Sequence, residues 1–148
     1  MTKRTSGLIL KRTTASHVET VLADLSPISA KDVEKCLVSG YDFKSDMLNN
    51  KRCLSIIMDD KPCAVIKIPN ADDINDIVWV MLTNEAMKQP FRLHRETFKM
   101  VRLWVKRFGG VRTTCIKTNK VSIRWLLSLG FAVIGQRDDN GDFVLEAN

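Results

Sequence analysis

The stretch NKVSIRWLLSLGF, residues 119–131, decides how the fold of this 148-residue chain is predicted. Asn119 is a residue type that caps helix N-termini, and Gly130 is a type that ends helices. The residues between them recur at helical spacing and are predicted to be buried: Val121, Trp125 or Leu126, and Leu129. The stretch therefore predicts a short amphipathic helix that is followed at once by a buried strand.

Outside this stretch, apolar runs separated by Ser, Pro, Gly and Asp predict further helices and strands. Strands are predicted at 7–12, 53–58, 63–68, 77–82, 111–116, 131–136 and 142–145. Helices are predicted from a cap at Thr14 or Ser16 to 25, and at 29–39, 91–108 and 120–129. Hairpins are predicted at 59–62 and 138–141, whereas 41–50 is polar and irregular. The order β-α-α-β-β-β-α-β-α-β-β predicts an α/β (α+β) fold, a mixed sheet flanked by helices.

Size and composition predict one domain, residues 1–148. Apolar residues make up 45% of the chain and charged residues 27%, which is typical of a soluble globular protein. No apolar run is long enough to predict a membrane span, and the N-terminal residues do not resemble a signal peptide.

Cysteines and histidines do not predict a metal site. The four cysteines, Cys36, Cys53, Cys63 and Cys115, stand in apolar stretches without a C-x-x-C pair and are predicted to be free core thiols. The two histidines, His17 and His94, are far apart in sequence.

The predicted helix at 91–108 is the longest, and its apolar residues suggest a buried stripe: Phe91, Phe98, Val101, Val105 and Phe108. Trp79, Trp104 and Trp125 are predicted to be core or interface anchors. Trp104 lies off this stripe, so it is the best candidate among them for a contact with another chain.

Positive charge is concentrated around the same helix. The chain carries a net charge of +6, and eleven Lys and Arg residues but only one acid, Glu96, lie between residues 88 and 124. Five of them recur at three- and four-residue steps and are predicted to share one helix face: Arg92, Arg95, Lys99, Arg102 and Lys106. This face predicts a site for an anionic partner, either nucleic acid bound without sequence specificity or an acidic protein. A solvated face without a partner is the alternative.

The element order, together with Asn119, Ser122, Trp125-Leu126 and Gly130-Phe131 at their spacings, resembles the GNAT superfamily of acetyl-CoA-dependent N-acetyltransferases. The resemblance spans nearly the whole chain. It implies the GNAT fold, and it implies two features needed for acetyl transfer.

The first implied feature is a glycine-rich loop that binds the pyrophosphate of acetyl-CoA at a helix N-terminus. Here Gln89 stands at the first position of that pattern, but Arg92 and His94 occupy the glycine positions, and Pro90 removes an N–H donor. The loop is thus degenerate, and no cofactor-binding residues are predicted.

The second implied feature is a tyrosine that acts as general acid. Leu126 occupies its position, and the only tyrosine is Tyr41. The sequence thus leans against catalysis and predicts no catalytic residues. Acetyl-CoA is a cofactor only under the alternative hypothesis, an active N-acetyltransferase of unknown acceptor.

The second half of the chain also resembles the internal virion protein A-like proteins of short-tailed (podovirus) bacteriophages. The similar parts are the Trp79 strand, the basic helix, the Ser122-Ile-Arg-Trp-Leu helix and the final hairpin. This resemblance implies a non-catalytic protein of virion assembly or genome ejection, found in the particle or in the cytoplasm of the infected cell. Its implied partners are other virion proteins or DNA. A phage-encoded binder of a host protein is a further alternative.

Overall fold

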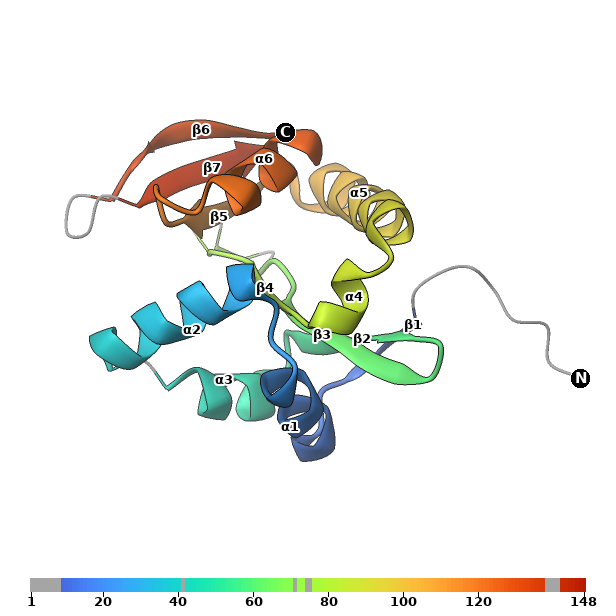
Figure 1. Ribbon diagram of the computed structural model, residues 1–148. Helices are drawn as coiled ribbons and strands as arrows, with labels where there is room; N and C mark the ends of the chain where they lie inside the picture. Colours follow the sequence, from blue (N-terminus) through green and yellow to red (C-terminus); the bar gives the residue numbers. More distant parts are fainter. Residues whose placement is uncertain (1–8, 41, 71, 74–75, 138–141) are drawn as a thin grey trace, which may run out of the picture.

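The computed structural model describes residues 9–40, 42–70, 72–73, 76–137 and 142–148, without the side chains of residues 36–39 (Figure 1). Within these ranges, seven strands form two antiparallel sheets. The first has the order β1-β2-β3-β4, formed by β1 (Ile9–Arg12), β2 (Cys53–Met58), β3 (Lys61–Lys67) and β4 (Trp79–Leu82). The second has the order β5-β7-β6, formed by β5 (Val111–Cys115), β6 (Phe131–Gln136) and β7 (Phe143–Ala147).

The first sheet is built around the predicted hairpin of β2 and β3, in which Ile56 pairs with Ala64. Its turn is tight because Asp59 and Asp60 both adopt positive φ angles, 51° and 65°. Such angles suit the two-residue turns that match strand twist, and Asp tolerates them better than most residues. β4 contributes to the core on both of its faces, because Met81 and Leu82 belong to different core clusters.

Three helices precede β2: α1 (Ala15–Ala23), α2 (Pro27–Ser39) and α3 (Phe43–Asn49). Thr14 caps α1, as predicted, by accepting a hydrogen bond from the His17 N–H. The interpretation of 41–50 as irregular was wrong, since Asp42 caps α3 and the helix buries Phe43 and Met47. α1 and α3 pack on one face of the first sheet, where Val18, Val21, Val65 and Met81 meet.

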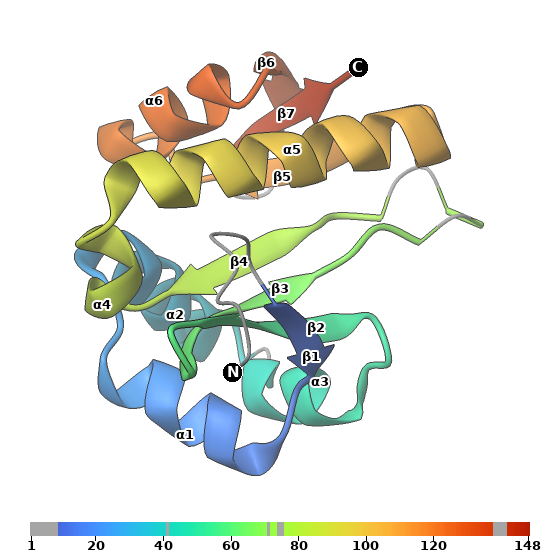
Figure 2. The same cartoon turned by 90° about the vertical axis from the view of Figure 1, so that its right-hand side faces the viewer.

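Two helices connect β4 to β5: α4 (Asn84–Met87) and α5 (Pro90–Phe108). Figure 2 shows α5 crossing the molecule between the two sheets, with β4 on one side and α6 (Lys120–Ser128) and β7 on the other. Leu93 near its start joins the core of the first sheet, and Val101 joins that of the second. α5 therefore packs against both sheets.

The stretch 119–131, which predicted a helix followed by a strand, folds as expected at both ends of the helix. The Asn119 side chain accepts from the Ser122 N–H at 3.4 Å and donates to the Ile28 carbonyl at 3.3 Å, which ties α6 to α2. Gly130 ends the helix with φ +97°. The predicted inward face was only partly right, because Leu129 is buried but Val121 is 57% exposed.

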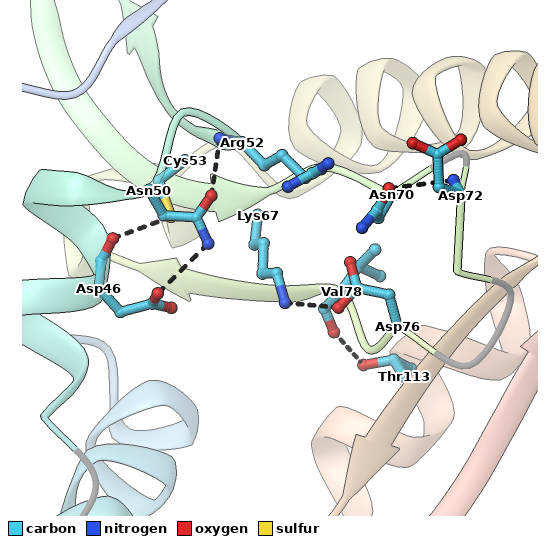
Figure 3. Close-up of polar contacts among 10 residues, drawn as sticks. All are labelled: Asp46, Asn50, Arg52, Cys53, Lys67, Asn70, Asp72, Asp76, Val78 and Thr113. Atoms are coloured by element: carbon cyan, nitrogen blue, oxygen red, sulfur yellow. Dashed lines mark hydrogen bonds and ion pairs between the residues drawn. The ribbon is translucent and has the colours of Figure 1, made fainter.

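A short junction joins the sheets. The Val78 N–H donates to the Arg112 carbonyl at 2.9 Å. The Thr113 hydroxyl donates to the Val78 carbonyl at 2.8 Å, as Figure 3 shows. Just before it, the Lys67 ammonium pairs with Asp76 at 2.7 Å between mostly buried side chains. Ile77 and Arg112 form the one parallel bridge found between β4 and β5 in the described part of the chain. Beyond it the strands separate, so the mixed sheet is split in two.

Cys53, Cys63 and Cys115 are buried free thiols, as predicted, whereas the Cys36 side chain and the 138–141 turn lie outside the described residues. Among the residues described, no three His, Cys, Asp or Glu side chains are grouped as a metal site. In that part of the chain, no helix has the length and apolar character needed to cross a membrane.

We expect Thr113→Val to lower the free energy of unfolding by about 1–2 kcal/mol, because it keeps the side-chain shape but leaves the Val78 carbonyl without its hydroxyl donor. Urea denaturation measures the change. Thr114→Val, on the other face of β5, is the matched control. Equal losses in the two variants would show that the hydroxyl does not stabilise the junction.

We expect Gly130→Ala to destabilise the fold by about 1–3 kcal/mol, since a side chain is strained at φ +97°. Its Cβ would also lie 2.7 Å from Nη2 of Arg102. Thermal unfolding checks this, with Gly135→Ala in open space as control. The same Gly130→Ala change in an Arg102→Ala variant removes the clash but keeps the backbone strain, so the melting temperature should still fall there. An unchanged melting temperature for Gly130→Ala alone would contradict the argument.

Candidate functional site

The gap between the diverging strands β4 and β5 lies at the centre of the molecule. It is lined by side chains from both sheets and from α5 and α6, among them Leu82, Leu93, Trp104, Trp125, Leu126 and Phe131. The remaining cavity has a volume of about 60 Å³. That volume holds a few water molecules, whereas pockets for small-molecule ligands usually measure about 300–1,000 Å³.

Two of the side chains that line the gap are tryptophans. Trp104 on α5 and Trp125 on α6 both pack against the cores of the first and the second sheet. Of the two roles predicted for the tryptophans, the structure gives Trp104 the core role, because its helix turns it inward, and the interface role suggested for it is not the one observed. Such large rings bury extensive apolar surface, so they stabilise the separation of the strands from within.

The residues of the degenerate loop lie at the start of α5, and each contacts the protein itself. Gln89 is the N-cap residue, and its carbonyl oxygen Oε1 accepts from Arg92 Nη1 at 3.1 Å. The same guanidinium reaches Asp59 at 3.2 Å. His94 Nε2 lies 3.2 Å from the Ser128 hydroxyl on α6.

The Thr83 hydroxyl accepts from the Ala86 N–H and so caps α4, a short helix that the sequence did not predict.

Leu126, which stands at the position of the implied general acid, also has apolar surroundings. Leu126 is half-buried and packs against the core of the second sheet. Tyr41 lies outside the described residues. No proton donor for a departing thiolate was predicted, and Leu126 supplies none.

The predicted basic face of α5 divides into two groups. Arg95, Lys99 and Lys106 are exposed, whereas Arg92 and Arg102 are half-buried. Glu96 is only 12% exposed and lies within 4 Å of the charged groups of Arg95 and Lys99. Six Lys and Arg residues against this one acid put +5 of the net charge of +6 on α5.

The Arg102 guanidinium is held against the protein surface by its own contacts. Its Nη1 donates to the Asn148 carbonyl at 3.3 Å, and its guanidinium lies 5.6 Å from the ring centre of Phe98. Its Nε and Nη2 are buried without a hydrogen-bond partner in the described structure. Of the five predicted partner-binding residues, three are therefore open to solvent and two are held against the protein.

The predicted apolar stripe of α5 was right for Val101, which is buried, and for Val105, which packs against the core of the second sheet, but wrong for its phenylalanines Phe91 and Phe98. Phe91 is 90% exposed and Phe98 39% exposed, and they lie on the cationic face. The helix instead buries Leu93, Thr97 and Val101. Thr97 occupies the core face because its hydroxyl donates to the Leu93 carbonyl at 2.6 Å. The i, i+4, i+7 and i+8 spacing of Leu93, Thr97, Met100 and Val101 was the signal for this face, and the polar Thr97 interrupted it.

A partly buried polar cluster that the sequence did not predict joins α2 to the residue that precedes β7. Lys35 forms an ion pair with Asp142, whose side chain is 10% exposed, and Asp32 lies beside them. Burial, with the neighbouring Asp142 carboxylate, raises the pKa of Asp32 to about 6 although Lys35 opposes the shift. Burial also raises the pKa of the Cys115 thiol, which disfavours its thiolate.

Asp32 generates a pH-dependent prediction. Because its pKa is raised above 3.8 in the folded state, the fold favours its protonated form, and that stabilisation is lost as the pH rises from about 4 to about 6. We expect Asp32→Asn to raise the free energy of unfolding by about 1–3 kcal/mol at pH 8 and to change it little near pH 4. Urea denaturation across this range measures it, with exposed Glu34→Gln as control. A gain that does not vary with pH would contradict the assignment.

The sequence matches no protein-family model and no curated protein at a significant level. Solved structures are nevertheless similar in fold. A putative acetyltransferase has a TM-score of 0.68 at 16% identity, covering 97% of this chain and 84% of its own. The PaiA N-acetyltransferase from Thermoplasma acidophilum, solved with coenzyme A, has a TM-score of 0.61 at 14% identity, with 96% and 99% covered.

A GNAT-family acetyltransferase from Streptococcus agalactiae has a TM-score of 0.61 at 12% identity, with 95% of this chain and 94% of the other covered. These identities are low, so the similarity concerns the fold alone. The structural similarity, together with the element order, the split sheet and the helix–strand stretch at 119–131, shows that this chain has a GNAT-like α/β fold.

Proposed function

We propose that this protein is a non-catalytic, GNAT-like binding protein that contacts an anionic partner through the exposed cations of α5. The observation that carries the proposal is the placement of Arg95, Lys99 and Lys106 on one solvent-exposed helix face, with Glu96 largely covered. Glu96 contacts both Arg95 and Lys99, but one acid balances only part of the charge of the three cations. A row of cations with such an excess attracts polyanions, and the attraction weakens with salt.

The filled gap supports the non-catalytic part of the proposal. A cofactor arm inserted between β4 and β5 would have to displace Trp104 and Trp125 from the cores of both sheets. The side chains of Arg92 and His94 also occupy the positions where the implied loop has small residues. Acetyl-CoA is therefore not proposed as a cofactor.

The biological setting is proposed from the sequence resemblance to internal virion protein A-like proteins. In that setting the protein serves virion assembly or genome ejection of a short-tailed bacteriophage, in the particle or in the cytoplasm of the infected cell. Its partner is then DNA, another virion protein or a host protein. Purification from infected cells, followed by identification of co-purifying molecules and of particle-associated chain, tests the setting.

We expect the protein to bind a labelled DNA duplex at low salt, with an affinity that falls steeply as salt rises. Replacing Arg95, Lys99 and Lys106 with alanine should flatten the slope of log K against log salt by up to about 3, because each lost phosphate contact removes about 0.9. The matched control replaces Lys31, Lys44 and Lys61, which are exposed elsewhere on the surface. Equal effects of both triple variants would contradict a role for the α5 face.

Calorimetry with acetyl-CoA tests the non-catalytic part separately. We expect no saturable binding heat, because the gap has no room for the thioester arm. Micromolar binding accompanied by release of free coenzyme A with a polyamine or peptide acceptor would overturn this part and favour an active N-acetyltransferase.

A further inference from the structure

Aromatic side chains share the cationic face of α5 and have no role in the packed core. Phe91 follows Pro90 at the first turn of the helix and is 90% exposed. Phe98 lies two turns further along the same face, about 10 Å away by helix rise, and is 39% exposed. Exposed apolar residues are common singly, but two rings aligned with a row of cations form a patterned surface.

Phe98 is held in a stacked column along the helix. The His94 ring stacks on it with centroids 6.1 Å apart and an interplanar angle of 27°. Arg102 lies on the same ring at 5.6 Å and is itself held by the Asn148 carbonyl. The column is thereby ordered before any partner arrives, whereas the Phe91 ring, one turn before it, is almost fully accessible.

The exposed cations run beside the rings. Arg95 lies one turn after Phe91, and Lys99 lies one turn after Arg95, so the two follow one edge of the aromatic row. The acid nearest to them, Glu96, is 12% exposed and contacts both. A partner that approaches this face thus meets positive charge along one edge and π surfaces along the other.

We propose that the α5 face binds single-stranded nucleic acid, with Arg95 and Lys99 contacting phosphates and Phe91 stacking on a base beside the His94–Phe98–Arg102 column. This rests on the proposed function, because the same cations supply the attraction. A single strand presents unstacked bases next to its phosphates, and aromatic and guanidinium planes stack on such bases without reading sequence. A duplex hides its base faces, and an acidic peptide has none, so neither uses the exposed rings.

The test compares three fluorescein-labelled probes of about equal charge by anisotropy at low salt: an oligo-dT of about 12 nucleotides, a duplex of matched charge and a poly-glutamate peptide. We expect the single strand to bind about fivefold or more tighter than the other two. Phe91→Ala should weaken binding to the single strand about tenfold and to the duplex less than about twofold, since base–ring stacking is lost only in the first case. Because Phe91 is 90% exposed, its removal should leave the melting temperature unchanged.

Leu103→Ala is the matched control, since Leu103 is 59% exposed on the same helix but lies to one side of the aromatic row. It should change neither affinity. Equal affinity for single strand and duplex, both insensitive to Phe91→Ala, would overturn this inference and leave the proposed function standing. Preference for poly-glutamate would overturn it in favour of an acidic protein partner. Absence of binding to all three probes would overturn both proposals.

Discussion

The arrangement of the molecule depends on the short junction at which Val78 meets Arg112 and Thr113. Two hydrogen bonds, of 2.9 and 2.8 Å, hold the start of β4 against β5. Each strand is otherwise committed to antiparallel partners, β4 to β3 and β5 to β7. Because only one end is held, sheet twist carries the strands apart beyond it. The space so opened has to be filled by side chains from the elements that flank it.

α5 and α6 supply side chains that fill this space. Because two of them are tryptophans, little free volume remains at the centre of the protein. Trp104 and Trp125 contact the cores of both sheets, so the same rings that occupy the gap also join the two halves. About 60 Å³ remains. The small remaining volume at the centre and the charge on α5 are the observations that support the proposal of a function at the surface.

The outward face of α5 concentrates the features that distinguish the surface. Packing decides which residues it presents: Leu93, Thr97 and Val101 turn inward, and this rotation places Phe91 and Phe98 among the cations. Arg92 and Arg102 share the face but are used internally, by Asp59 and by Phe98 with Asn148. The cations left to solvent thus occupy a narrower row than the sequence predicted, and aromatic rings accompany it.

The sequence by itself determined the local signals: the Thr14 and Asn119 caps, the stop at Gly130, the β2–β3 hairpin and the order of most elements, because these depend on residues close in the chain. It did not reveal α3 or α4, whose caps stand in polar stretches that carry no apolar periodicity. Only the tertiary structure decided the rotation of α5, the inward position of Trp104 and the meeting of Asp32 with Asp142. Each of these requires contacts between distant segments, which the spacing of residues within one helix does not specify.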